Sequence, residues 1–312
     1  MQSSPGFHKE ISARFGSERV GTEVPLAAYT TFKVGGPAEW FLEARSADEI
    51  VDALRLAQAS RVNVTLLGGG SNVLIGDRGV RGLVIRPRGG VVEQIDQDRV
   101  RADAAVTING LVRWTVQRGI AGVEAWAGTP GTVGGAIFGN AHFAGRLIGD
   151  LVESVRLAAL DGETRDLSCD EMEFGYDRSR LQTTGEVLLS AVFRVSTGDP
   201  AALRAVARES LAYRKKTQPL DTPSAGCIFQ NPDRSDVPAD IPASAGALVD
   251  RAGLKGTSLG DARVSTTHGN FIVNEGHASA AEIRALIDLC RARVREQFGV
   301  ALQEEIVYLG DF

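Results

Sequence analysis

The sequence predicts an α+β protein that folds into two or three compact units. The chain has 312 residues, which is long enough for such a division and for a sizeable core. Short apolar runs typical of strands alternate with segments of helical periodicity. Two glycine-rich stretches, at residues 67–74 and 125–140, each follow an apolar segment. Together these observations predict a mixed fold whose loops contain the functional groups.

The first predicted domain covers residues 28–88 and follows a polar, loosely helical leader at residues 1–27. Residues 40–44 are an apolar strand candidate. Ser46 to Glu49 has the pattern of a capping box, and apolar residues at 50, 54 and 57 continue the helix that it starts. Two more strands are predicted at residues 62–67 and 82–85.

The second and third predicted domains cover residues 89–200 and 201–312, with Asp199-Pro200 between them. In the second we expect a hairpin at residues 91–95 and 100–105, a helix over 111–116 that ends near Gly119, and strands at 151–160 and 185–195 around an Asp161-Gly162 turn. In the third we expect helices at 201–215, 245–252 and 278–298 and strands at 269–273 and 305–309.

Composition and charge exclude several classes of protein. The net charge is −5 with no dense basic block, so we expect no nucleic-acid partner. No signal-peptide core and no run of about 20 apolar residues is present, so we expect a cytoplasmic protein with no membrane partner. The three cysteines and four histidines lack metal-ligand spacing, so we expect no metal site and no disulfide. We also expect a monomer.

The two glycine-rich stretches predict a ligand site. Glycine lets the backbone approach a ligand closely, and successive N–H groups in such loops form anion-binding nests. Two such loops indicate one phosphate-rich cofactor held from two sides. The alternative for each loop taken alone is an ordinary tight turn.

Several motifs then resemble, in order, those of one family. They are T-T-F-K-V-G-G at residues 30–36, L-G-G-G-S-N at 67–72, G-T-P-G-T-V-G-G-A at 128–136, A-G-L-K-G at 252–256 and H-G-N-F-I-V-N at 268–274. The family is UDP-N-acetylenolpyruvoylglucosamine reductase, and the resemblance covers about residues 28–310. The segment between Ala136 and Cys169 is too short for the tyrosine-bearing insertion of one branch, so the chain resembles the shorter branch.

The resemblance implies a vanillyl-alcohol-oxidase-type FAD-binding fold of two subdomains and a C-terminal substrate-binding domain. It implies that NADPH reduces FAD and that the reduced flavin passes hydride to an enolpyruvyl ether, giving UDP-N-acetylmuramic acid. The cofactor-binding residues that it implies are Leu67, Gly68, Gly69, Gly70, Ser71, Asn72, Gly128, Thr129, Pro130, Gly131, Thr132, Gly134, Gly135 and Ala136.

The resemblance also implies a proton donor at Cys227, where the family usually has serine. An unperturbed thiol is mostly protonated at neutral pH and can donate. The alternative is that Cys227 is a small buried apolar side chain. Gln230 stands where lysine is common, which puts one polar contact in doubt.

The enolate partners implied by the resemblance are a glutamate and an arginine. Glu305 matches the family's C-terminal pattern, whereas Glu304 fits a surface carboxylate. The family motif G-Y-R-x-S has Asp177 at its arginine position here. Arg178 or Arg180 is expected to supply the guanidinium, and Arg178 is preferred.

The remaining predicted site residues bind substrate. They are Arg214, Lys215, Gln218 and Asn231; for the basic turn that includes Arg214 and Lys215, the alternative is a solvated helix end. We expect His142 and His268 to be structural, because no acidic partner lies at helical or strand spacing from either.

Two other functions stay open at this point. One is an FAD-dependent oxidoreductase of the same fold with another substrate, although the glycine loops contain no histidine or cysteine to tether a flavin. The other is an FAD-binding homologue that has lost turnover, which the departures at Asp177, Cys227 and Gln230 would suit. A dinucleotide-binding dehydrogenase is not expected, because no G-x-G-x-x-G turn with a downstream acid is present.

Overall fold

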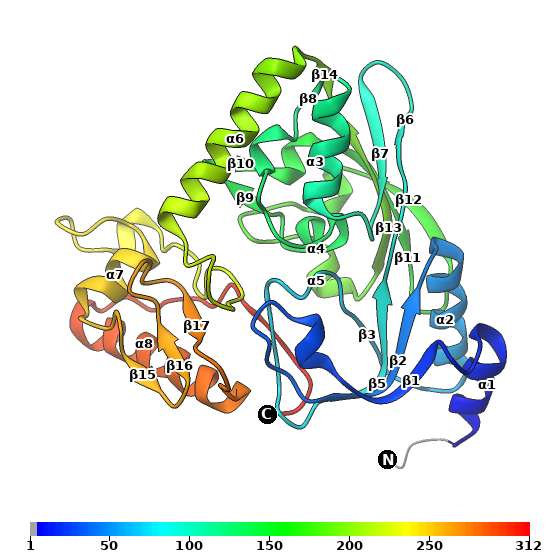
Figure 1. The fold of residues 1–312 in the computed structure, drawn as a ribbon, viewed down its shortest axis with the longest axis horizontal. Coiled ribbons are helices and arrows are strands. Elements are labelled where there is room, and N and C mark those ends of the chain that lie inside the picture. The colour runs from blue at the N-terminus through cyan, green and yellow to red at the C-terminus, as the bar shows by residue number, and fades with distance from the viewer. Residues whose placement is uncertain (1–4) are drawn as a thin grey trace. The chain divides into compact units, whose positions relative to one another are not determined.

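The computed structural model describes residues 5–312, and these divide into two compact units (Figure 1). The first unit contains the described residues up to Val24, with Glu39–Gly69 and Arg81–Tyr213; the second contains Pro25–Ala38, Gly70–Val80 and Arg214–Phe312. Residues 1–4 of the predicted leader lie outside the described residues.

The N-terminal sheet has four strands, in the order β1 (Val20–Pro25), β2 (Pro37–Ala44), β5 (Val80–Pro87) and β3 (Val64–Leu66). Helix α2 (Ala47–Ala59) begins as predicted, because the Ser46 hydroxyl accepts the N–H of Glu49 at 3.2 Å. Its buried face packs with strand residues such as Leu42 and Leu83 in one core cluster. The predicted strands and helix of this region are confirmed.

Helix α1 (Pro5–Phe15) is packed into the same core. Phe7 is 1% exposed, and its ring centroid lies 5.0 Å from that of Trp40. Ile11 and Phe15 are also buried there. The leader therefore contributes three apolar residues to the core. The sequence did not predict this contribution, because the leader is polar overall.

The second sheet has five antiparallel strands in the order β12-β11-β13-β7-β6, and helices α3 (Ile108–Gln117) and α4 (Val133–Phe138) pack on it (Figure 1). The strands are β6 (Val92–Gln94), β7 (Arg99–Asp103), β11 (Val152–Ala158), β12 (Thr164–Ser168) and β13 (Val187–Arg194). The predicted β6-β7 hairpin and helix α3 are confirmed.

One strand of this sheet was not predicted. The Asp161-Gly162 turn leads from β11 into β12, and β13 pairs with the other side of β11. Strand β12 lies at the sheet edge, and four of its five residues are exposed. An edge strand with polar residues on both faces lacks the period-2 alternation that marks a half-buried strand.

The second unit is built around α7 (Ala245–Arg251) and α8 (Ala280–Phe298), with strands β15 (Ser258–Leu259), β16 (Ala262–Val264) and β17 (Ile272–Asn274). Strand β18 (Val307–Leu309) pairs in parallel with β4 (Val73–Ile75), which directly follows the first glycine loop. The predicted helices are confirmed, whereas β4, β15 and β16 were not predicted; two of the three residues of β4 were counted with the first glycine-rich stretch. The helix predicted at 201–215 is α6 (Pro200–Thr217).

Short elements complete the chain: β8 (Ile120–Ala121) pairs with β14 (Ser196–Thr197), and β9 (His142–Phe143) pairs with β10 (Arg146–Leu147). The remaining short helices are η1 (Leu26–Tyr29), η2 (Glu124–Trp126), η3 (Ile148–Leu151), η4 (Asp170–Met172), α5 (Leu181–Thr184) and η5 (Arg234–Asp236). Over residues 5–312, no helix has the length and apolar character needed to cross a bilayer.

Candidate active site

The two glycine loops touch in the first unit. A Cβ added to Gly69 would lie 2.5 Å from the Cα of Gly131, and one added to Gly68 would lie 2.8 Å from Thr132 Oγ1. Only glycine permits this approach at Gly69, because the opposing atom is backbone and cannot swing away. Within the described residues, the N–H groups of Gly68 and Gly69 donate to no protein acceptor. Such a close-packed backbone pair fits a phosphate-containing cofactor.

The second glycine loop is shaped by its neighbours. Gly128 and Gly131 have φ of +83° and +103°, which favour glycine. The N–H of Gly128 donates to Asn109 Oδ1 at 2.7 Å, and the carbonyl of Gly131 accepts the N–H of Ile108 at 3.1 Å. Thr132 then caps α4, since its hydroxyl accepts the N–H of Gly135. The loop is therefore held in one conformation before any ligand binds.

The end of the first loop belongs to the second unit and is fixed there. A Cβ on Gly70 would lie 2.1 Å from the carbonyl oxygen of Tyr29, and Gly70 has φ of +63°. The N–H and hydroxyl of Thr31 both donate to the carbonyl of Gly70, at 2.9 and 3.2 Å. Asn72 Nδ2 donates to the carbonyl of Glu305 at 3.1 Å. One cofactor loop is thus fastened to the segment that carries a predicted catalytic residue.

Cys227 and Glu305 lie on neighbouring backbone segments of the second unit. The N–H of Glu305 donates to the carbonyl of Ile228 at 2.8 Å, one residue from Cys227. The buried Asn270 side chain fixes the same stretch, because its amide donates to and accepts from the Phe229 backbone at 2.7 and 2.9 Å. Both Cys227 and Glu305 are half-buried. The structure therefore places the backbone segments that contain the predicted proton donor and the predicted glutamate side by side.

Glu304 has a different role from its neighbour. Its carboxylate accepts Arg291 Nη1 at 2.9 Å, and Arg291 also pairs with Asp288 on α8. Glu304 was expected to be a surface carboxylate; its side chain is 17% exposed and is engaged by Arg291.

Arg214 is a buried cation close to Cys227. It is 6% exposed at the C-terminal end of α6. Burial lowers the pKa of Arg214 to about 10, and the negative charge of a Cys227 thiolate acts on that pKa in the opposite direction. The two side chains therefore interact electrostatically, and Arg214 favours the ionised thiol.

The other predicted substrate residues are placed as follows. Lys215 is exposed, and Gln218 is half-buried with its N–H donating to the carbonyl of Arg214 at 2.9 Å. Asn231 Oδ1 accepts the N–H of Ala245 at 3.0 Å, at the start of α7. Gln230, which replaces the common lysine, uses its N–H to bond the carbonyl of Gln303 at 2.9 Å.

The turn at residues 175–179 contains the departure from the family motif. It is tied to the second glycine loop through α4: Asn140 Nδ2 donates to the carbonyl of Gly175 at 2.7 Å, and Ser179 Oγ donates to the carbonyl of Phe138 at 2.7 Å. Asp177 lies in this turn with φ of +51° and is buried. Arg178 is exposed, and within residues 5–312 it forms no ion pair.

Arg180, the alternative guanidinium, is already engaged. Its Nε donates to Glu186 Oε2 at 2.9 Å, and this contact with the carboxylate raises the pKa of Arg180. Glu186 is also paired with Arg165. The structure therefore leaves Arg178 better suited than Arg180 to meet a ligand.

Sequence analysis missed an acidic partner for His142. Its Nδ1 lies 2.9 Å from Asp177 Oδ1, across 35 residues of sequence. No local spacing reveals such a pair, because a loop and a hairpin bring it together. His268, in contrast, accepts the N–H of Asn270 at Nδ1, and burial, then the charge of Lys255, lowers the pKa of His268.

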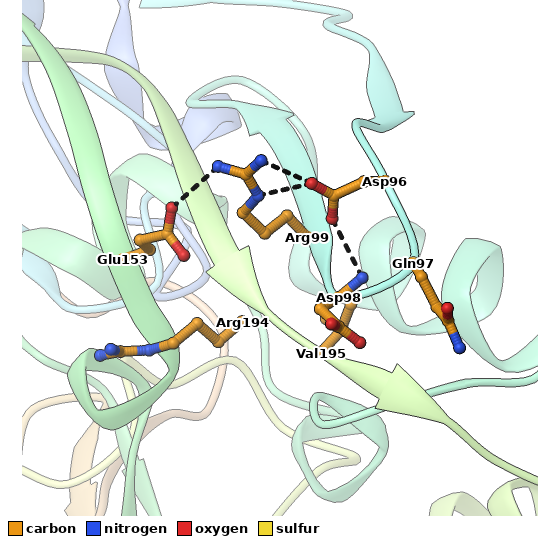
Figure 2. A pocket seen from close by; sticks show the side chains of 7 residues that line it. All are labelled: Asp96, Gln97, Asp98, Arg99, Glu153, Arg194 and Val195. Atoms are coloured by element: carbon orange, nitrogen blue, oxygen red, sulfur yellow. Dashed lines mark hydrogen bonds and ion pairs between the residues drawn. The ribbon is translucent and has the colours of Figure 1, made fainter.

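A hollow of about 520 Å³ in the first unit is lined by no predicted site residue. Figure 2 shows the side chains that line it. Arg99 in this hollow donates to Asp96 and to Glu153, at 2.5 and 3.3 Å. The arginine holds the pKa of Asp96 below its usual value, and the two carboxylates offset the positive charge. We assign no function to the hollow, which is lined by Asp96, Gln97, Asp98, Arg99, Glu153, Arg194 and Val195.

Comparison with known proteins identifies the family of the chain. Residues 38–168 match the FAD binding domain, and residues 218–309 match the UDP-N-acetylenolpyruvoylglucosamine reductase C-terminal domain. The chain is 40% identical over 294 residues to UDP-N-acetylenolpyruvoylglucosamine reductase of Synechococcus sp. (strain WH7803), with 92% of each chain covered. Its counterpart in Geobacillus thermodenitrificans (strain NG80-2) is 33% identical over 311 residues and is covered, like this chain, to 100%.

A solved structure supports the same conclusion. The crystal structure of UDP-N-acetylenolpyruvylglucosamine reductase from Thermus caldophilus has a TM-score of 0.77 and 32% identity, covering 93% of this chain and 99% of that chain. The predicted α+β, FAD-binding fold is confirmed. The chain therefore belongs to the UDP-N-acetylenolpyruvoylglucosamine reductase family.

Proposed function

We propose that this protein reduces the enolpyruvyl ether of UDP-N-acetylenolpyruvoylglucosamine to UDP-N-acetylmuramic acid, with NADPH as the reductant, in peptidoglycan precursor synthesis. Family membership supports the reaction. The observation that carries it is the backbone pairing of the two segments that contain Cys227 and Glu305, which Asn72 fastens to the first glycine loop.

FAD, when bound, supplies hydride transfer between the reductant and the substrate. The residues proposed to hold it are those of the two glycine loops, where Gly69 and Gly131 meet without side chains. The chain's own residues must then orient the substrate, stabilise its developing charge and deliver one proton.

We propose that Cys227 is that proton donor. After hydride reaches the methylene carbon of the substrate, an enolate remains, and the α-carbon takes the proton from the Cys227 thiol. The thiolate left behind is stabilised by the buried Arg214 and regains its proton from solvent. Arg178 is proposed to pair with the substrate carboxylate, and Glu305 to act beside it as a neutral carboxyl that donates a hydrogen bond, since an ionised glutamate would repel that group. Arg214, Lys215, Gln218 and Asn231 are proposed to bind the rest of the substrate.

The domain boundaries predicted near residues 88 and 200 are also proposed for the functional subdomains. Three separate core clusters support this division, because they centre on the N-terminal sheet, the five-stranded sheet and helices α7 and α8. We further propose that the protein acts as a monomer in the cytoplasm; within residues 5–312 its three cysteines form no disulfide, which suits a reducing compartment.

The test separates the two half reactions. Holoenzyme reduced by NADPH without oxygen is mixed with UDP-N-acetylenolpyruvoylglucosamine in a stopped-flow instrument, and flavin absorbance is followed. Wild type is expected to reoxidise rapidly. Cys227→Ala is expected to bind flavin and accept hydride normally but to reoxidise about 10²- to 10⁴-fold more slowly, since a general acid contributes that much.

Cys227→Ser is the matched control, because a hydroxyl restores the donor. Normal reoxidation of Cys227→Ala would refute the proton-donor assignment. A wild-type reduced flavin that the substrate cannot reoxidise would refute the proposed reaction itself.

A further inference from the structure

The backbone directly after Cys227 is held from two sides within the second unit. On one side, the carbonyl of Ile228 accepts the N–H of Glu305 at 2.8 Å. On the other side, the N–H of Ile228 donates to the carbonyl of Asn270 at 2.9 Å. The segment that contains the proposed proton donor is therefore bonded both to the segment of Glu305 and to the segment of Asn270.

Asn270 bonds this segment with its side chain as well as with its backbone. Its Oδ1 accepts the N–H of Phe229 at 2.9 Å, and its Nδ2 donates to the carbonyl of the same residue at 2.7 Å. One amide side chain thus satisfies both backbone polar groups of Phe229, as a neighbouring strand would. Asn270 and Phe229 are both buried, so the loss of these bonds would leave polar groups that water does not readily reach.

The position of Asn270 is fixed in turn by a histidine. The N–H of Asn270 donates to His268 Nδ1 at 3.2 Å. The imidazole packs edge-to-face on Phe271, with ring centroids 5.0 Å apart. The carbonyl of His268 also accepts the N–H of Phe271 at 3.0 Å, which closes a tight turn before Asn270 continues into β17. The amide that holds the segment after Cys227 therefore has little freedom to move.

The other buried asparagine of the H-G-N-F-I-V-N motif bonds different partners. Asn274 and Asn270 are each 3% exposed. The Asn274 side chain donates to the carbonyl of Phe32 at 3.0 Å and accepts the N–H groups of Gly276 and Ala278. The two asparagines thus have the same burial and the same kind of backbone bonds. Of the two side chains, only that of Asn270 bonds the segment of the proposed proton donor.

We propose that Asn270 is a positioning residue for proton delivery: it fixes the backbone that carries the Cys227 thiol, and His268 supports it. Proton transfer to the α-carbon of the substrate requires the donor at hydrogen-bond reach, so a small displacement of the thiol slows this step. No bond is made or broken at Asn270 or His268. The inference rests on the proposed function.

The experiment is a double-mutant cycle in the anaerobic stopped-flow assay. Asn270→Ala removes the amide that bonds Phe229, and it is made in wild type and in Cys227→Ala. Asn274→Ala is the matched control, because it removes an equally buried amide from the same motif. For each protein we measure flavin content, the rate of flavin reduction by NADPH and the rate of reoxidation by UDP-N-acetylenolpyruvoylglucosamine.

Asn270→Ala is expected to slow reoxidation about 10- to 100-fold, because a displaced catalytic group loses that much rate. Flavin content and reduction by NADPH stay unchanged. In the Cys227→Ala background, the same substitution is expected to change the reoxidation rate by less than about twofold, since no thiol is left to position. Asn274→Ala is expected to change reoxidation by less than about twofold in both backgrounds, a result that general loosening of the unit would not produce.

Equal slowing by Asn270→Ala with and without the thiol would overturn the proposal, as would equal slowing by Asn274→Ala or no slowing at all. If Asn270→Ala does not fold, His268→Leu replaces it. That variant removes the acceptor of the Asn270 N–H and must slow reoxidation when the thiol is present, whereas His268→Asn keeps an acceptor and must not. Failure of the wild-type reduced flavin to be reoxidised would instead count against the proposed function.

Discussion

The paired glycine loops and the turn at residues 175–179 are built on different principles. At the loops, Gly69 and Gly131 approach so closely that no side chain fits between them. At the turn, the contacts are between side chains that meet across 35 residues, as with His142 and Asp177. In the first region, backbone geometry restricts which residue can occupy each position. In the second, a residue can be replaced if the residues that contact it change to match its charge.

This difference explains which part of the motif set is intact in this chain. The glycine loops match the quoted family motifs, and a Cβ added at Gly69 or Gly70 would lie 2.5 or 2.1 Å from backbone atoms that cannot swing away. The turn has exchanged an arginine for Asp177 and has a histidine in contact with it. A side-chain network can be rebuilt from other residues, which is not possible for a backbone contact.

The largest expected effect comes from breaking the backbone region. Gly69→Ala places a Cβ 2.5 Å from the Cα of Gly131, so one of the two loops must move. We expect the variant to fold but to lose at least about tenfold in FAD affinity, because the loop amides no longer converge. The ratio of flavin to protein absorbance after purification measures this.

Gly139→Ala is the control for that prediction. Gly139 lies in the second glycine-rich stretch, at residues 125–140, and its added Cβ would meet only the carbonyl oxygen of Gly135 at 3.9 Å, an ordinary contact. We expect normal flavin content. Equal flavin loss in both variants, or in neither, would contradict the view that the Gly69 contact is specific.

The next largest effect concerns Asn140, which links the second glycine-rich stretch to the turn at residues 175–179. Asn140 is fully buried; its Oδ1 accepts the N–H of Gly149 at 2.9 Å and its Nδ2 donates to Gly175. Asn140→Gly keeps the left-handed backbone but removes both hydrogen bonds, so we expect about 2–4 kcal/mol lower stability in urea unfolding. Reoxidation by substrate should slow while flavin content stays normal.

Asn109 provides the matching test for the glycine loops. It bonds Gly128 in the second glycine loop, so Asn109→Ala should lower flavin affinity without slowing reoxidation of the flavin that is bound. If both asparagine variants affect the same step, the two regions are not functionally separate.

The sequence predicted the fold well and the side-chain network poorly. Helix α2 follows from Ser46 and a clear apolar period, and the loops follow from glycine, whose backbone role is local. Strand β12 is polar on both faces, and β4 is three residues long, so neither has a periodic signal. The contact of His142 with Asp177 depends on tertiary structure, which no spacing rule encodes.

The smallest expected effect concerns His268. Among the described residues, it has no carboxylate partner. Burial lowers the pKa of His268, so near pH 6.5 and below, the unfolded chain binds a proton that the folded chain resists. The stability contributed by neutral His268 is therefore complete above pH 6.5 and is lost as the pH falls through the folded pKa. In His268→Asn, the amide oxygen replaces Nδ1 as the acceptor for Asn270. The difference in unfolding free energy between wild type and variant should be constant above pH 6.5 and change below it by at most about 1.4 kcal/mol per pH unit. A constant difference down to pH 5 would show that burial does not lower the pKa of His268. The environments of His268 and His142 would then not differ in the way proposed.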